Sequence, residues 1–224
     1  MTRGILITGN ESTLFSSIAA EAAKRVESYA SALIPNRLPQ RDGGLLPRAE
    51  AASGAIPLSW NPPSPVSART LVLAAENRLV QINDAILVCA PPAIYRTAEA
   101  LTPEEIEVLV DDHIKGWFFL IRELLLYFRS RKSGSLSFVA PEVGPAGKNV
   151  QTDLLGPPAA SCFVNYASGI FASSVTEPFQ VAGFSGSETG DKGEFAAWLF
   201  KLIDEGARKT SFRWNKFSKL GFLR

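Results

Sequence analysis

The chain has 224 residues, of which 46% are hydrophobic and 20% are charged, and its formal net charge at pH 7 is +1. This length suits a single domain with a large core, and the composition excludes a disordered chain. The near-neutral charge balance provides no overall attraction to nucleic acid or to an anionic membrane surface.

The cysteines and the apolar segments indicate where the protein resides. Cys89 and Cys162 stand among apolar or small residues, which favours reduced, buried thiols over a disulfide framework. The longest apolar stretch, 117–128, is interrupted by two charged residues, so no membrane-spanning segment is expected. After Arg3 the N-terminus has only a short apolar run, unlike a secretory leader. These features predict a cytoplasmic protein without a membrane partner.

Apolar runs with strand character alternate with helical patterns along the whole chain. Strands are predicted at 5–8, 29–35, 55–60, 84–90, 136–140 and 179–184. Helices are predicted at 16–28, 66–80, 103–128 with a bend near Gly116, 159–175 and 194–205. Residues 36–54 are rich in Pro, Gly and Arg and are predicted to form a loop. Because parallel strands need crossover connections, the alternation predicts one α/β domain over 1–224, a Rossmann-like, doubly wound parallel sheet.

The order of motifs resembles the short-chain dehydrogenase/reductase family over nearly the whole chain. The segments that carry the resemblance are Thr8-Gly9 after the first strand, the apolar strand at 84–91, the helical segment Asp-Asp-His-Ile-Lys-Gly at 111–116, and the strand at 134–139. Members of that family bind NAD or NADP at the first strand–turn–helix. If such binding is retained here, the resemblance places it on Thr8, Gly9, Asn10, Asn36, Arg37 and Ala90.

The glycine pattern of the family's first turn is largely lost. The family pattern is Thr-Gly-x-x-x-Gly-x-Gly, and here Thr13 and Phe15 take the second and third glycine positions. Glycine lets backbone N–H groups approach a pyrophosphate closely, so the two side chains are expected either to obstruct the site or to lie in the contact between helix and strand. Glu11 adds a negative charge in the same turn. The turn is therefore either a packed connection or a weakened nucleotide site. No cofactor is expected, with NAD or NADP kept as an alternative.

The catalytic positions of the family are also substituted. The resemblance places the family's Ser at Pro141, its Tyr at Pro158, its Lys at Cys162 and its Asn at His113. Proline has no titratable group, and a neutral cysteine does not supply the charge of lysine. No catalytic residue of the family type is therefore predicted.

His113 is the only histidine of the chain and allows two interpretations. Its ring is either a general base or ligand contact beneath a pocket, or a helix side chain bonded to a backbone carbonyl. Asp111 and Asp112, which precede it, are expected to be acids on the helix surface. No His or Cys spacing typical of a metal site occurs, so no metal is predicted.

Two segments are candidates for contacts with partners. The helix at 104–128 is apolar on nearly every face in its second half, so one face should cover the sheet and another should meet a partner. Since members of the resembled family commonly dimerise through this helix, a homo-oligomer or a heteromer with an active relative is expected. The tail at 208–224 interleaves basic and aromatic residues. It either holds single-stranded nucleic acid or forms a last strand with an intersubunit contact; nucleic acid is the less expected partner.

These observations leave two classes of function. The first is a catalytically degenerate homologue of the resembled family that acts as a structural or regulatory subunit. The second is an NAD(P)-dependent oxidoreductase or small-ligand binder with a noncanonical pocket, to which His113 and the loop at 141–157 would contribute.

Overall fold

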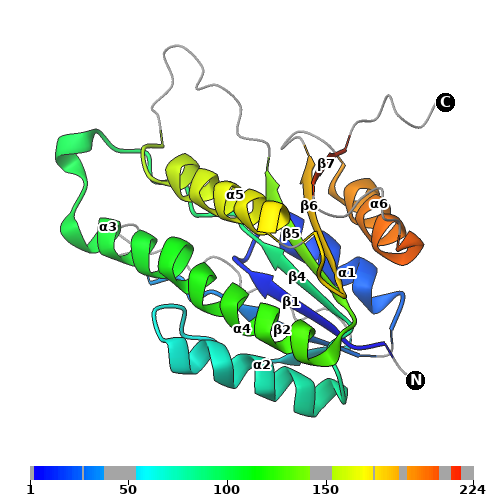
Figure 1. Ribbon diagram of the computed structural model, residues 1–224. Coiled ribbons are helices and arrows are strands. Elements are labelled where there is room, and N and C mark those ends of the chain that lie inside the picture. Colours follow the sequence, from blue (N-terminus) through cyan, green and yellow to red (C-terminus); the bar gives the residue numbers. More distant parts are fainter. Residues whose placement is uncertain are drawn as a thin grey trace.

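A computed structural model describes residues 3–26, 28–37, 54–141, 153–173, 175–186, 191–206 and 213–217. Within these residues the strands form one parallel sheet in the order β3-β2-β1-β4-β5-β6-β7 (Figure 1). The strands are β1 (Ile5–Gly9), β2 (Tyr29–Leu33), β3 (Ala55–Pro57), β4 (Asp84–Val88), β5 (Ser135–Pro141), β6 (Gln180–Gly186) and β7 (Trp214–Lys216). The predicted doubly wound α/β fold is confirmed.

Helices cover both faces of this sheet (Figure 1). They are α1 (Thr13–Ala23), α2 (Pro65–Leu79), α3 (Pro103–Val110), α4 (Gly116–Arg131), α5 (Gly156–Ser173) and α6 (Lys192–Glu205). Buried residues of α2, α4 and α5 join one hydrophobic cluster with the sheet, and those of α1 and α6 join a second cluster. The sheet is therefore the middle layer of three.

The predicted helix at 16–28 is wrong at both ends, because α1 spans 13–23. Its start is set by Ser12, whose hydroxyl accepts a hydrogen bond from the backbone N–H of Phe15 at 3.1 Å. Helix α5 also begins earlier than predicted, where Asp153 accepts the backbone N–H groups of Leu155 and Gly156. Strands β2 and β3 end earlier than predicted. The remaining elements agree with the prediction within a few residues.

The long helix predicted at 103–128 contains a π-helical turn directly before Gly116, near which a bend was predicted. Helix α3 begins at a capping box of Thr102 and Glu105, and a π-helical turn, η2 (Asp111–Lys115), separates it from α4. A π-turn holds one residue more per turn than an α-helix, so it changes which side chains face inward. Gly116 ends the turn against Pro62, whose Cβ would lie 2.4 Å from a Cβ placed on the glycine.

Part of the C-terminal tail forms a strand at the edge of the sheet. Only 213–217 of the tail at 208–224 is described, and it supplies the last strand, β7. The Trp214 indole N–H donates to the Ser168 hydroxyl at 3.0 Å, so this ring is held against α5.

Cys89 is buried and Cys162 only half-buried, both as free thiols; burial raises the pKa of the Cys89 thiol. No helix among the described residues is long and apolar enough to cross a membrane.

Candidate functional site

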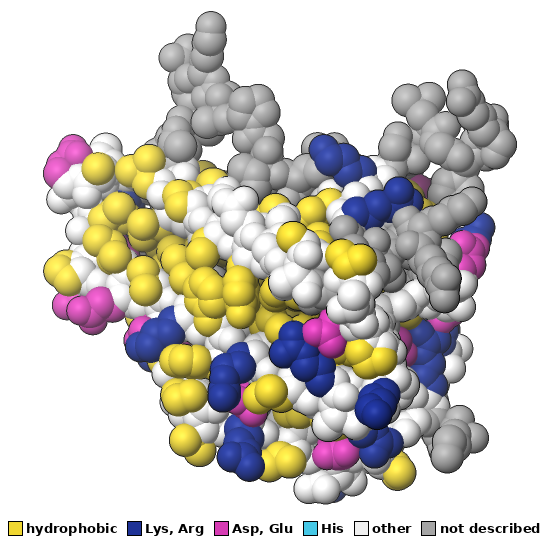
Figure 2. Space-filling view, viewed as in Figure 1, with side chains coloured by type: hydrophobic (Ala, Val, Ile, Leu, Met, Phe, Trp, Pro, Cys, Tyr) yellow, Lys and Arg dark blue, Asp and Glu magenta, His cyan; other side chains and the backbone are white. Residues whose placement is uncertain are grey.

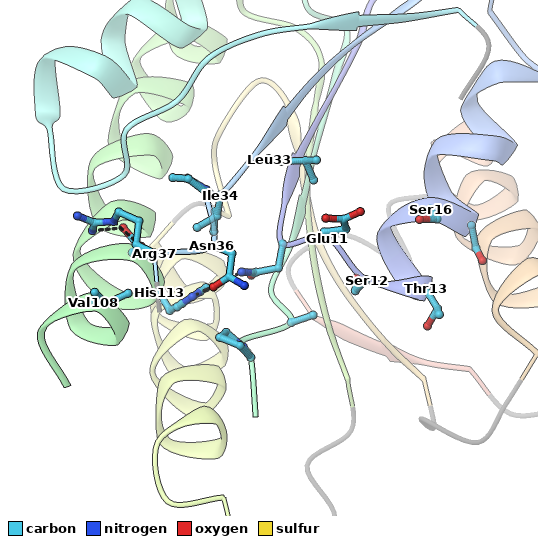
Figure 3. A pocket seen from close by; sticks show the side chains of 16 residues that line it. Glu11, Ser12, Thr13, Ser16, Leu33, Ile34, Asn36, Arg37, Val108 and His113 are labelled. Atoms are coloured by element: carbon cyan, nitrogen blue, oxygen red, sulfur yellow. Dashed lines mark hydrogen bonds and ion pairs between the residues drawn. The ribbon is translucent and has the colours of Figure 1, made fainter. Parts of the chain in front are cut away.

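A cavity of about 720 Å³ lies at the carboxyl ends of β1, β2 and β4. Strand β1 sits between β2 and β4, which extend the sheet in opposite directions, and ligands of doubly wound folds bind at this switch point. In Figure 3 the turn with Ser12 and Thr13 lies on one side of the cavity and Val108, Arg37 and His113 lie on the other. The wall comes from four segments: residues 10–13 with 16 and 17, 33–37, 90 with 92, and 108 with 112 and 113.

The turn between β1 and α1 leaves this cavity open. Phe15 is buried beneath α1 in the same cluster as Ile18 and Ala22, and it is not part of the cavity wall. The alternative that Phe15 obstructs the site is therefore wrong. Once α1 begins at Thr13, these residues fall on the inward face of the helix. Thr13 does line the cavity, as expected.

The structure brings together four of the six predicted cofactor-binding residues: Asn10, Asn36, Arg37 and Ala90. Thr8 and Gly9 are not part of the wall. Thr8 is fully buried, and its hydroxyl has no hydrogen-bond partner among the described residues. A Cβ on Gly9 would lie 2.3 Å from the carbonyl oxygen of Val88, so this glycine is needed for the close approach of β1 and β4.

An ion pair joins the end of β2 to the π-turn. The Arg37 guanidinium donates from Nε to one oxygen of Asp112 at 3.0 Å and from Nη2 to the other at 2.5 Å. The Asp112 side chain is 1% exposed, whereas that of Arg37 is 37% exposed. The hydrogen bonds from Arg37 to Asp112 raise the pKa of Arg37. Such bidentate, charge-assisted pairs are among the strong hydrogen bonds of proteins.

The prediction for the two acids before His113 holds for one of them only. Asp111 lies on the helix surface and pairs with Lys115 at 3.0 Å. Asp112 was expected on the surface too, but it is buried against Arg37. The π-turn explains the difference, because it faces two consecutive residues, Asp112 and His113, inward. Nothing in the local sequence marks Asp112 as part of the site.

His113 borders the same cavity and is 3% exposed. Its Nε2 lies 3.5 Å from the side-chain nitrogen of Asn10, and its Nδ1 has no hydrogen-bond partner among the described residues. The expected bond to a backbone carbonyl is therefore absent from this part of the chain. Burial, and next the positive charge of Arg37, lower the pKa of His113 to about 4. The ring is thus neutral at pH 7 and faces the cavity as a polar, uncharged group.

The positions that the resemblance assigns to the family's Ser, Tyr and Lys carry none of these residues. Pro141 ends β5, and Pro158 lies exposed in the first turn of α5, where its missing N–H is not needed by the helix. Cys162 follows one turn later and is half-buried. The loop at 141–157, which was expected to contribute, is described only at its ends. No group of His, Cys, Asp or Glu suited to a metal ion occurs in the described ranges.

No family model matches the chain, and no curated protein gives a significant sequence match. Solved structures do match. A short chain dehydrogenase from Mycobacterium smegmatis has a TM-score of 0.76 at 12% identity, over 97% of this chain and 92% of that one. Levodione reductase has a TM-score of 0.75 at 16% identity, over 96% of both chains. A 3-ketoacyl-(acyl-carrier-protein) reductase from Brucella melitensis, complexed with NADH, has a TM-score of 0.74 at 13% identity, over 96% of both. The chain therefore has the fold of the short-chain dehydrogenases/reductases.

Proposed function

We propose that this protein is a catalytically degenerate relative of the short-chain dehydrogenases/reductases that keeps a small-ligand pocket and acts as a structural or regulatory subunit. The observation that carries the proposal is the cavity of about 720 Å³ at the switch point, with Phe15 packed away from it. Its volume is in the range of ligand pockets, and polar side chains line it from three of its four segments. Pro141, Pro158 and Cys162 support the degenerate chemistry, because none of them is a proton donor of the family type.

The position and the volume of the pocket suit a nicotinamide dinucleotide, but the net charge of its wall does not. The reductases of this fold that were solved with NAD or NADH bind a ligand that carries phosphates. Among the described residues of the wall, Glu11 and Asp112 carry negative charges and Arg37 the one positive charge, which sums to −1. Arg37 is also engaged by Asp112. We therefore assign no reaction step to NAD or NADP in this chain.

Calorimetric titration with NADH, NADPH and adenosine tests the proposed function. We expect adenosine to bind, neither dinucleotide to bind more tightly than adenosine, and no carbonyl compound to be reduced. The binding heat of adenosine should disappear in Ser16→Trp, because Ser16 lines the cavity and an indole would fill it. Turnover of a carbonyl or alcohol with either dinucleotide would contradict the degenerate chemistry. Binding that survives in Ser16→Trp would contradict the pocket.

The role as a subunit depends on the face formed by α4 and α5. Phe118 on α4 is 39% exposed, and its ring lies 4.2 Å from that of Tyr166 on α5. Leu126, two turns further along α4, is 47% exposed. Figure 2 shows hydrophobic side chains gathered where α4 and α5 lie next to each other. Exposed apolar side chains that cluster in this way are typical of association surfaces.

Phe118→Asp should weaken self-association or association with a related subunit through this face. Burying a charge at the centre of an apolar interface costs about 2 kcal/mol or more, which is roughly a 30-fold rise in the dissociation constant. Sedimentation velocity over a range of concentrations measures it. Ala197→Asp is the matched control, because Ala197 is exposed on α6, which packs on the other side of the sheet from α4 and α5. If both variants dissociate alike, or if wild type remains monomeric alone and with its relatives, the face is not the interface.

A further inference from the structure

The positively charged residue of the pocket wall, Arg37, is paired with a buried carboxylate, that of Asp112. Arg37 is the one Lys or Arg among the described residues of the wall, and one edge of its guanidinium, formed by Nε and Nη2, is bonded to Asp112 at 3.0 and 2.5 Å. Rossmann-like folds use an arginine close to this place to accept the extra phosphate of NADP. Here a phosphate would have to share the guanidinium with Asp112 or displace Asp112 from it.

We propose that the Arg37–Asp112 pair makes the pocket selective against ligands that carry a phosphate at the β2 end, so that its ligand presents uncharged polar groups there, as a nucleoside does. The inference rests on the proposed ligand pocket and names the ligand class. A phosphate that took Nε and Nη2 of Arg37 would leave the carboxylate of Asp112, which is 1% exposed, without its cation, and this is costly for a buried charge. A phosphate at the other edge of Arg37 would lie close to a carboxylate that already offsets the positive charge, so both positions disfavour a phosphate.

Asp112 is in a position from which it cannot withdraw. It lies in the π-turn between α3, which is fixed by its capping box, and Gly116, which packs against Pro62 with no room for a Cβ. Moving the carboxylate to solvent would disturb these packed contacts, which opposes such a movement. Asp112 therefore acts as a positioning residue: it decides what Arg37 is able to bind.

Two other polar groups of the wall are uncharged and buried. His113 is 97% buried with Nδ1 lacking a partner among the described residues, and the side-chain oxygen of Asn10 likewise lacks one there. Both residues belong to the cavity wall. Buried polar atoms of this kind are normally satisfied, and hydroxyl or amide groups of a neutral ligand would satisfy them.

Asp112→Asn tests the proposal, because it removes the carboxylate charge and keeps the side-chain shape. The probes are adenosine and adenosine 2′-phosphate, which differ only in the phosphate. In wild type we expect adenosine to bind at least as tightly as the phosphate. In Asp112→Asn we expect the affinity for adenosine 2′-phosphate to rise at least tenfold, while that for adenosine changes less than twofold. Calorimetry with circular dichroism as a check of folding gives both results.

Two further variants separate this gain from a general change in charge. Asp111→Asn removes a neighbouring carboxylate that pairs with Lys115 instead, and should leave both affinities unchanged. Asp112→Asn combined with Arg37→Gln should lose the gain. A folded Asp112→Asn protein whose affinity for adenosine 2′-phosphate does not rise overturns the proposal. Wild type that binds adenosine 2′-phosphate more tightly than adenosine also overturns it, and this result does not require that the variant folds. Adenosine binding without a gain in Asp112→Asn overturns the selectivity but leaves the pocket. A gain in that variant without adenosine binding in wild type supports the selectivity and rejects the nucleoside as ligand.

Discussion

Replacing Trp117 by alanine is expected to lower the free energy of unfolding by about 4 kcal/mol, the cost typical of truncating a buried tryptophan. Trp117 is 1% exposed and lies in the first turn of α4. Its ring centroid is 5.3 Å from that of Trp60 and 5.1 Å from that of Phe163. The indole therefore fills the space between three parts of the chain, and its removal leaves a cavity that the packed neighbours cannot close. Urea unfolding followed by far-ultraviolet circular dichroism measures the loss.

Trp117→Phe is the matched control, because it keeps an aromatic ring at this position. We expect it to lose roughly 1–2 kcal/mol, since most of the contact area remains and only part of the volume is vacated. A loss below about 2 kcal/mol for Trp117→Ala would mean that α4 is held on the sheet without this contact. Equal losses for the two variants would mean that an aromatic ring of the size of phenylalanine does not stabilise this region.

The parts of the fold that depend on local sequence could be predicted. Apolar runs of strand length and the helix start at Thr102-Pro103 are local signals, and the parallel sheet follows from their alternation. The segments of the cavity wall could be anticipated as well, because the carboxyl ends of neighbouring parallel strands meet at one edge of the sheet. Asn10, Asn36 and Ala90 come together for this reason.

The contacts that give the site its chemistry could not be predicted. Arg37 and Asp112 are 75 residues apart, and their pairing depends on a π-turn that no spacing in the sequence indicates. Phe15 is different, because its signal was present. Ser12 is a good N-cap, and a helix that begins at Thr13 places Phe15 on the same face as Ile18. Because the helix was predicted to begin at Ser16, Phe15 was assigned to the turn and its side chain was wrongly expected in the cofactor site.

Acidification is expected to destabilise wild type more than His113→Asn, with a difference of about 3 kcal/mol at pH 4. Burial and the charge of Arg37 lower the pKa of His113 to about 4 in the folded protein, against 6.5 in an unfolded chain. Between these values the unfolded chain binds the proton and the folded protein does not. The stability that the neutral ring provides is therefore fully present above pH 6.5 and is lost as the pH falls toward 4. Urea unfolding of both proteins at several pH values measures the difference.

Because His113 is the only histidine, histidine ring signals in a proton NMR titration belong to this residue, and they report its pKa independently of the stability measurement. We expect their chemical shifts to stay constant from pH 7 to pH 5 in the folded protein. A midpoint near 6.5, or parallel stability curves for wild type and His113→Asn, would contradict a buried neutral ring. Arg37→Gln should move the midpoint upward, because it removes the positive charge that opposes protonation. The ion pair and the neutral histidine are thus coupled: burial keeps His113 uncharged, and the positive charge of Arg37, which Asp112 holds in the wall, adds to this effect.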